Sequence, residues 1–243
     1  MAWRCSGKTN GELISNLRRE GLISSGRVAE AMKQVDRAKY CPDKRGAYQD
    51  SPQPIGYSAT ISAPHMHAHS AEELLPYLTA DSSVLDIGSG SGYLLAVFHH
   101  LVKPLPGEED KVSTQRQGSR VIGIEHISEL VEQSKDNLKD DGLGDAMERG
   151  QIEVVKGDGR LGWPLRQPYN AIHVGAASPP SVLATLEAQL AKPGRLFIPV
   201  EDPETREQDI WHIDKDAQGN VTRKKMYGVR YVPLTDEARQ YGF

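Results

Sequence analysis

Apolar residues at helical spacing begin the chain. They predict a helix over residues 9–20, with Asn10 as its N-cap and Gly21 as the residue that ends it. The same spacing predicts a second short helix over residues 25–35. Residues 36–64 are rich in Pro, Gly, Ser and Tyr, which favours an ordered loop lying over another part of the protein rather than a helix or strand.

After residue 64 the pattern changes to short apolar stretches that alternate with helical ones. A helix is predicted first, over residues 65–78. The predicted parallel strands are residues 83–86, 120–125, 152–156, 171–174 and 195–200, and the helices between them are residues 93–101, 128–138 and 181–190. This alternation predicts an α/β fold, in which a doubly wound, mostly parallel sheet is covered by helices on both faces.

The end of the sequence departs from this alternation. Residues 209–214 and 221–233 read as strands joined by a turn at residues 218–220. They predict an antiparallel pair that closes the sheet. Residues 103–119 form a polar insertion, which we expect to be a surface loop.

Length and composition limit the class of protein. A chain of 243 residues is long enough for one large α/β domain, and we predict an extension over residues 1–64 and a core over residues 65–243. The net charge of −4 and the pI near 6.1 disfavour a nucleic-acid partner. No apolar stretch reaches the roughly 18 residues of a membrane span, and no signal peptide is recognisable. Two cysteines without metal or redox spacing indicate a reducing, cytoplasmic location, and a monomer is the default expectation.

The stretch VLDIGSGSGYL at residues 84–94 carries the strongest functional signal. It reads as a buried strand, a glycine turn and the first turn of a helix. Alternate glycines allow a tight turn and bring the main chain close to a ligand, and the helix N-terminus offers N–H donors. In a doubly wound sheet, a nucleotide-like cofactor binds at such a place, outside the carboxyl end of a strand.

Acidic residues at three successive strand ends indicate the kind of cofactor. Asp86 precedes the glycines, Glu125 ends the second strand and Asp158 follows the third. Glu125 suits ribose hydroxyls, Asp86 a cationic amino group and Asp158 an adenine amino group. Three carboxylates disfavour a dinucleotide pyrophosphate and favour S-adenosylmethionine, which carries a sulfonium and an ammonium. The alternative is that these acids are only helix caps or turn residues.

Several segments together resemble the protein-L-isoaspartate (D-aspartate) O-methyltransferase family, in its eukaryotic branch. The most specific are residues 60–68 (TISAPHMHA) and 173–177 (HVGAA). The others are residues 1–3, 50–53, 86–92, 121–126, 157–160, 169–172 and 231–236, so the resemblance covers nearly the whole chain. It implies a seven-stranded class I methyltransferase sheet in a single methyltransferase domain. It also implies S-adenosylmethionine-dependent methylation of the free carboxyl of L-isoaspartyl and D-aspartyl residues in damaged peptides and proteins, which initiates repair through a succinimide.

The resemblance implies functional residues as well. Ser62 matches the active-site serine of the family. The positions that match the cofactor pocket are Ile55, Gly56, Tyr57, Ser58, His67, Asp86, Gly88, Ser89, Gly90, Glu125, His126, Gly157, Asp158, Thr235 and Gln240. The loop around Tyr57 is expected to cover the cofactor. Three departures from the family pattern are the insertion at residues 103–119, which is longer than expected, the short tail between Gln240 and Phe243, and the lack of a second glycine in residues 191–195.

The implied acceptor needs no base, because a carboxyl with a reference pKa of about 3.9 is ionised at neutral pH. Ser62 is expected to donate a hydrogen bond that orients the acceptor, or alternatively to cap the helix that begins near His65. His173 is expected to be a buried, hydrogen-bonded residue, with a general-base role as the alternative. His65, His67 and His69 do not share one face of a helix, so no metal site is predicted.

Two other functions stay open at this point. One is a methyltransferase of the same fold that acts on a small molecule or on RNA. The other is a non-catalytic binding module that retains the cofactor pocket. Labelling of an isoaspartyl peptide, but not of its aspartyl twin, distinguishes the expected function from both.

Overall fold

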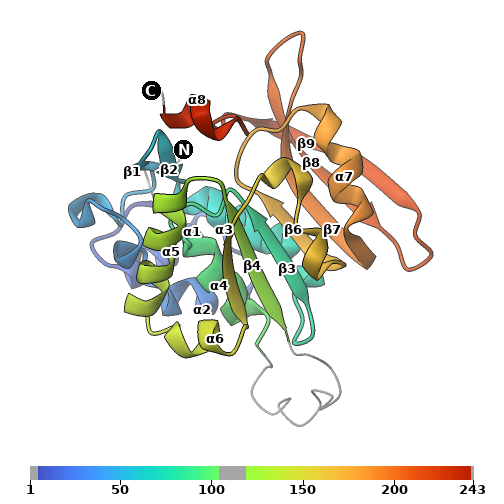
Figure 1. Cartoon of the computed structure of the whole chain (residues 1–243). Coiled ribbons are helices and arrows are strands. Elements are labelled where there is room, and N and C mark those ends of the chain that lie inside the picture. The colour runs from blue at the N-terminus through green and yellow to red at the C-terminus, as the bar shows by residue number, and fades with distance from the viewer. Residues whose placement is uncertain (1–4, 104–118, 242–243) are drawn as a thin grey trace.

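A seven-stranded sheet forms the centre of the fold. The computed structural model describes residues 5–103 and 119–241, and the sheet has the order β5-β4-β3-β6-β7-β8-β9 (Figure 1). The strands are β3 (Ser83–Ile87), β4 (Arg120–Glu125), β5 (Ile152–Lys156), β6 (Tyr169–Val174), β7 (Leu190–Glu201), β8 (Gln208–Lys215) and β9 (Val221–Val229). β3 to β7 run parallel, β8 is antiparallel to β7, and β9 is antiparallel to β8. The predicted doubly wound, mostly parallel sheet with a closing antiparallel pair is confirmed.

The chain changes direction across the sheet between β5 and β6. From β3 it proceeds through β4 to β5 at one edge, and then it crosses back to β6 on the other side of β3. β3 and β6 are directly paired, and their last paired residues are Ile87 and Val174. The carboxyl ends of β3 and β6 therefore flank the topological switch point, where ligands bind in sheets of this kind.

Alternate residues of the central strands face two separate hydrophobic cores. Val84 on β3 lies in one core, whereas Leu85 and Ile87 lie in the other. The first core includes residues of α1 (Asn10–Arg19), α2 (Gly26–Gln34), α3 (Pro64–Leu74), α4 (Tyr93–Leu101) and α5 (Ser128–Asp140), and the second includes residues of α7 (Leu183–Ala188) (Figure 1). The N-terminal helices therefore share a core with the helices that cover the sheet.

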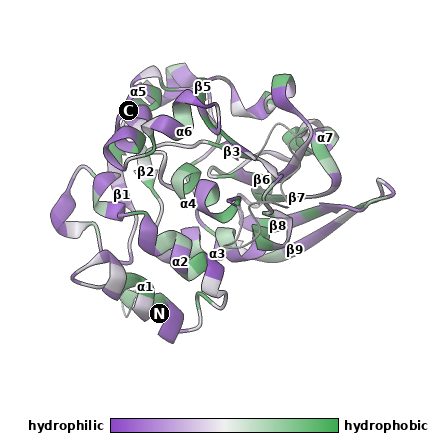
Figure 2. Ribbon diagram, turned by 90° about the horizontal axis from the view of Figure 1, so that it is seen from below, coloured by the Kyte–Doolittle hydropathy of each residue, from purple (hydrophilic) through white to green (hydrophobic). Residues whose placement is uncertain are grey.

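The remaining elements are short. The helix α6 (Gly144–Glu148) follows α5, and α8 (Glu237–Tyr241) ends the described chain. Turns of 3₁₀ helix lie at Arg37–Lys39, Lys44–Gly46, Leu75–Tyr77, Gly159–Leu161, Pro164–Arg166 and Pro180–Val182. The edge strand β9 is mostly hydrophilic (Figure 2), and it carries Arg223, Lys224 and Lys225. Charged side chains on an edge strand discourage pairing with other chains.

A β-hairpin interrupts the loop predicted over residues 36–64. β1 (Gln53–Gly56) pairs with β2 (Ala59–Ile61), and Tyr57 and Ser58 form the turn with φ of 51° and 53°. Such two-residue turns usually carry Asn and Gly, which tolerate positive φ. The sequence lacks that signal, so the prediction of a loop without strands is wrong here. In Figure 1, α8 lies beside the tip of this hairpin.

The N-cap of α1 is Thr9 and not Asn10. The Thr9 side-chain oxygen accepts a hydrogen bond from the Glu12 N–H at 3.2 Å. Asn10 is buried, and its amide donates to the carbonyl oxygens of Met32 and Val35, both at 3.0 Å. Asn10 thus satisfies carbonyl groups at the C-terminal end of α2 instead of N–H groups at the start of α1.

Some expectations fall partly or wholly outside the described ranges. Residues 104–118, which make up most of the predicted surface loop, and residues 1–3 lie outside them. Within the ranges described, no helix is both long enough and apolar enough to span a bilayer.

Candidate active site

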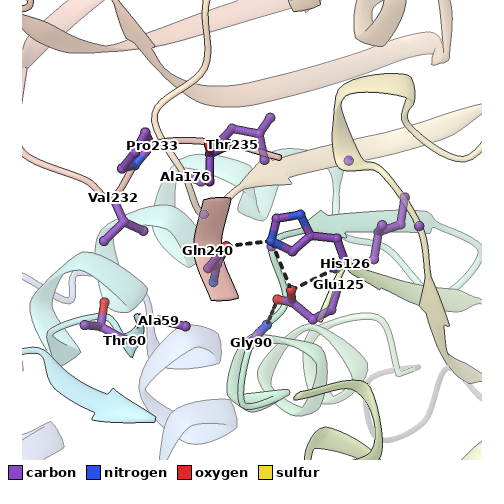
Figure 3. Close-up of a pocket in the computed structure, with 16 residues that line it drawn as sticks. Ala59, Thr60, Gly90, Glu125, His126, Ala176, Val232, Pro233, Thr235 and Gln240 are labelled. Atoms are coloured by element: carbon purple, nitrogen blue, oxygen red, sulfur yellow. Dashed lines mark hydrogen bonds and ion pairs between the residues drawn. The ribbon is translucent and has the colours of Figure 1, made fainter. Parts of the chain in front are cut away.

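Three adjoining hollows lie at the carboxyl ends of the parallel strands. The first is lined by the glycine turn, by the ends of β4 and β6 and by the C-terminal segment (Figure 3). The second has a volume of about 560 Å³ and is lined by Ser62, by the start of α3 and by residues 227–232. The third lies between them and is lined by His67, Asp86 and Ser89 among others. Thr60 and Gly175 line all three hollows, so the three meet at these two residues.

The glycine turn is pressed against the neighbouring strand. Gly88 N–H and Ser89 N–H both donate to the carbonyl oxygen of Ile124, at 2.9 and 3.1 Å. Gly90 has a φ of +49°, and a Cβ atom on it would lie 3.2 Å from Ile55 Cδ1. Only glycine adopts this backbone conformation without strain. The predicted pocket residue Ile55 therefore acts by packing over the turn.

Glu125 holds the glycine turn from the end of β4. Its buried carboxylate accepts hydrogen bonds from the N–H groups of Gly90 at 3.1 Å, His126 at 2.8 Å and Ile127 at 3.1 Å. A carboxylate offers about four acceptor positions, so capacity is left for a ligand hydroxyl in the first hollow, which Glu125 lines. Glu125 has a structural role that the sequence did not reveal, in addition to the position expected of it.

The C-terminal helix closes over the first hollow. The Oε1 of Gln240, on α8, lies 2.6 Å from His126 Nε2 (Figure 3). The Nε2 of Gln240 donates to the carbonyl oxygen of Tyr57 at 2.9 Å. Two ion pairs hold the same segment, Lys156–Glu237 and Arg160–Asp236, each at 2.8 Å. Gln240 therefore joins the hairpin tip to the end of β4.

Most of the predicted pocket residues meet at these hollows. Gly88, Gly90, Glu125, His126, Gly157, Thr235 and Gln240 line the first, and Ser62, His67, Asp86 and Ser89 line the third. Ser58 lies in a further hollow beside Thr235 and Gln240, and Gly56 and Tyr57 belong to the hairpin tip above. Thr60 and Gly175 belong to the two most specific segments of the resemblance, but they were not predicted as pocket residues, and Arg37 was not predicted to have a role.

Asp158 is the exception. Its carboxylate accepts from Arg160 Nε at 2.9 and 3.0 Å and from Arg160 Nη2 at 2.7 Å, and it does not line the first hollow. The bonds to Arg160 lower the pKa of Asp158. Asp86 and Glu125 are buried, whereas Asp158 is partly exposed, caps a 3₁₀ turn and is paired with an arginine two residues later. The role of Asp158 as a contact of the adenine amino group stays a prediction. Its neighbours Gly157 and Gly159 supply backbone to the hollow.

Asp86 is paired with His173 across β3 and β6. Both side chains are buried, and His173 Nδ1 lies 2.7 Å from Asp86 Oδ1. This agrees with the expectation of a buried, hydrogen-bonded His173. Close by, Ser89 Oγ is buried and lacks a hydrogen-bond partner among the described residues. The third hollow thus contains one anionic group and one polar group ready to contact a ligand.

Ser62 does not cap α3. The N-cap residue is Ala63, without a side-chain hydrogen bond. Asp50 satisfies this helix start instead, because its Oδ1 accepts from His65 N–H at 2.9 Å and lies 2.8 Å from His65 Nδ1. The capping alternative for Ser62 is therefore wrong. Within the described ranges, no cluster of three His, Cys, Asp or Glu side chains is arranged to hold a metal ion.

A parallel sheet with a glycine turn at its switch point, and with buried acids at neighbouring strand ends, defines the class of protein. It is the class I S-adenosylmethionine-dependent methyltransferase fold. Comparison with known proteins identifies the family. A family model described as Protein-L-isoaspartate(D-aspartate) O-methyltransferase (PCMT) matches residues 8–239. The chain belongs to this family.

Individual relatives agree with this assignment. The chain is 45% identical to the protein-L-isoaspartate O-methyltransferase of Caenorhabditis elegans over 99% of both chains. It is 44% identical to that of Triticum aestivum, over 95% of this chain and 93% of the relative. Its structure is similar to a solved chain from Plasmodium falciparum named protein-L-isoaspartate O-methyltransferase, in complex with S-adenosyl-L-homocysteine. That comparison gives a TM-score of 0.80 and 30% identity, and it covers 94% of this chain and 99% of the other.

Proposed function

We infer that this chain methylates the free carboxyl of L-isoaspartyl and D-aspartyl residues in damaged peptides and proteins, with S-adenosylmethionine as the methyl donor. The observation that carries the inference is the junction at Thr60 and Gly175. There the groove that contains Ser62 opens onto the two hollows lined by the glycine turn, in a chain of this family. One route therefore leads from the groove that contains Ser62 to the hollows beside the glycine turn.

The residues present fit the cofactor. Asp86, buried beside the glycine turn, would hold its ammonium, and Glu125 would hold a ribose hydroxyl. Ser89 Oγ, which lacks a hydrogen-bond partner among the described residues, is one further group that a ligand would satisfy. Gln240 would cover the bound adenosine from α8. The Plasmodium falciparum relative was solved with S-adenosyl-L-homocysteine, which supports this assignment. When bound, the cofactor supplies an electrophilic methyl group on its sulfonium.

The residues of the chain have to orient the acceptor and exclude water. The acceptor carboxyl arrives ionised, so no residue must remove a proton from it. Ser62 lines both the peptide groove and the third hollow, and we propose that its hydroxyl donates to the acceptor carboxylate. Correct positioning of two reactants contributes about 7–11 kcal/mol to lowering a barrier. In the resulting methyl ester, the backbone amide nitrogen of the next residue then attacks the ester carbonyl and methanol leaves, which gives the succinimide that begins the repair.

A matched pair of peptides tests the function. The wild-type protein is incubated with methyl-labelled cofactor and an isoaspartyl peptide, its D-aspartyl form or its ordinary aspartyl twin. Label is expected in the first two only, and equal labelling of the ordinary peptide would refute the substrate assignment. Ser62→Ala is expected to lower kcat about 10-fold or more, the range for one hydrogen bond to a charged group, with S-adenosylhomocysteine affinity unchanged. A loss of thermal stability with normal kinetics would show that Ser62 is structural.

The organisation of the chain and its setting belong to the same proposal. We propose a single methyltransferase domain, in which residues 1–64 extend over the site of a core formed by residues 65–243. The core shared by α1, α2 and α4 supports this. We propose a monomer in the cytoplasm, and Cys5 and Cys41, both buried and free, are in keeping with a reducing compartment. Light scattering and cell fractionation test these two statements.

A further inference from the structure

Arg37 is a buried cation without a carboxylate partner. It is 0% exposed and heads the fully buried side chains by volume. Arg195, by contrast, is paired: its Nε and Nη2 bind the two oxygens of Asp214 at 2.6 and 2.7 Å. Among the ion pairs of the described residues, none includes Arg37. Burying a charge without a carboxylate in direct contact is costly, so the position of Arg37 calls for an explanation other than stability.

The groups within hydrogen-bond distance of Arg37 are neutral acceptors, and an aromatic ring lies beside it. The buried carboxylate of Asp50 acts on Arg37 by charge alone, without forming an ion pair with it. Its Nη1 lies 3.3 Å from His67 Nδ1, and its Nη2 lies 3.5 Å from the carbonyl oxygen of Ser51. Its guanidinium carbon lies 5.7 Å from the centre of the Tyr93 ring. The shorter of the two hydrogen bonds is therefore the one to His67.

This contact fixes where the proton of His67 lies. A guanidinium has only N–H donors, so His67 Nδ1 must accept and cannot carry a proton. The ring proton of His67 is then on Nε2. Burial, and then the charge of Arg37, lower the pKa of His67 well below its usual range, so the ring is neutral. Tyr93 lies against the same ring, with centroids 4.8 Å apart, and keeps it from turning over.

His67 and Asp86 line the same hollow beside the glycine turn. A neutral ring with its proton on Nε2 offers one donor there, and Asp86 offers an anionic acceptor. An α-amino acid group, with one carboxylate and one ammonium, needs a donor and an acceptor of this kind. Because the buried cation Arg37 stands behind His67, the His67 end of the hollow favours the carboxylate and the Asp86 end favours the ammonium.

We propose that Arg37 is a positioning residue, which holds His67 as the Nε2–H tautomer so that it donates to the carboxylate of the cofactor's methionyl group. The proposal rests on the proposed function, because it assumes that the third hollow takes the amino-acid end of S-adenosylmethionine. Arg37 itself would not touch the cofactor. Its effect passes through one hydrogen bond to His67.

The tautomer is tested in the free protein. Nitrogen-15 NMR of the histidine rings, with the His67 signal assigned from a His67→Gln variant, is expected to show Nδ1 without a proton in the wild type. Arg37→Met is expected to change the two ring-nitrogen shifts of His67, whereas Arg37→Lys, which retains a donor, restores part of the wild-type pattern. A wild-type His67 that carries its proton on Nδ1 would overturn the proposal.

Binding of two ligands separates positioning from folding. S-adenosylhomocysteine has the amino-acid group, and 5′-methylthioadenosine lacks it. In calorimetry, Arg37→Met is expected to lower the affinity for S-adenosylhomocysteine about 10- to 100-fold, the range for one hydrogen bond to a charged group. It should lower the affinity for 5′-methylthioadenosine less than about 2-fold. Arg195→Met, which removes a paired arginine outside the site, is the control and should change neither affinity.

Each other outcome has a definite meaning. Equal losses for both ligands, or no loss for either, would refute the role of Arg37. Arg37→Met should also have no further effect in a His67→Ala background, since its action passes through that ring. A wild-type protein that binds neither ligand would instead refute the proposed function, so the two failures are distinguishable.

Discussion

Replacing Glu125 by Gln tests whether this side chain holds both the glycine turn and the cofactor. The substitution keeps the shape and removes the charge. In the wild type, Glu125 accepts from three N–H groups, those of Gly90, His126 and Ile127, at 2.8–3.1 Å. An amide has a single acceptor oxygen and a donating NH₂ group. If that oxygen keeps the bonds to His126 and Ile127, the NH₂ group must face the N–H of Gly90.

The expected magnitudes follow from these contacts. A buried donor left unmade at Gly90 costs about 1–3 kcal/mol, and the change from a charged to a neutral acceptor costs up to about 1 kcal/mol for each of the other two bonds. We therefore expect Glu125→Gln to lower the free energy of unfolding of the free protein by about 1–5 kcal/mol. We also expect S-adenosylhomocysteine to bind about 5- to 30-fold more weakly, since a ribose hydroxyl would meet a neutral acceptor.

Urea unfolding followed by circular dichroism measures the first effect, and calorimetry measures the second. Glu187→Gln is the control, because Glu187 is also buried but binds Arg223 at 2.6 and 2.7 Å away from the site. It should lower stability and leave affinity unchanged. Unaltered unfolding in Glu125→Gln would refute the role of Glu125 in holding the turn. An unaltered affinity for S-adenosylhomocysteine would refute the contact between Glu125 and the ribose hydroxyl.

Three further predictions concern other parts of the molecule. Gln240→Ala removes the contacts to His126 and Tyr57, so stopped-flow should show S-adenosylhomocysteine leaving about 3- to 20-fold faster, whereas Arg239→Ala on the same helix should show the wild-type rate. Asp86→Asn should lower the affinity for S-adenosylhomocysteine about 10-fold and leave the affinity for 5′-methylthioadenosine unchanged. An equal loss of affinity for both ligands would contradict a contact between Asp86 and the ammonium group. Burial, and to a smaller extent the charge of Lys103, lower the pKa of His99 to about 3 in the folded protein. Below the usual histidine pKa of about 6.5, the unfolded chain therefore binds a proton at His99 that the folded protein does not bind. The free energy of unfolding should therefore fall as the pH falls from about 6.5 towards 3. In urea titrations, His99→Leu should make the dependence of this free energy on pH shallower by about 1.4 kcal/mol per pH unit. An unchanged dependence would contradict the depressed pKa.

The sheet could be predicted from the sequence because strands that are buried on both faces consist mainly of apolar residues. β4 is apolar along most of its length, and its predicted and observed limits agree at residues 120–125. The glycine turn could be predicted as well, since glycine is the residue that most readily adopts the positive φ found at Gly88, Gly90 and Gly92. Both features depend on residues that are adjacent in the chain.

Features that depend on distant partners could not be predicted. The acid at Asp158 follows a strand as the one at Asp86 does, yet Asp158 is bound to Arg160, whereas Asp86 is bound to His173. Nothing in the local sequence around Arg37 indicates that it reaches His67, which lies on a different helix. The choice of partner is decided by packing between elements, and a sequence pattern does not record it.

The histidines around Ser62 show how this site differs from one that removes a proton. Each has its Nδ1 engaged by a charged side chain from another element: His65 by Asp50 at 2.8 Å, His67 by Arg37 at 3.3 Å and His173 by Asp86 at 2.7 Å. These contacts fix the ring orientations before any ligand arrives. An acceptor that is already ionised gains nothing from a base, but it gains from fixed donors and from a dry junction. The buried charged side chains of the site therefore hold the histidine rings and the glycine turn in place, which is the arrangement that a carboxyl methyltransferase requires.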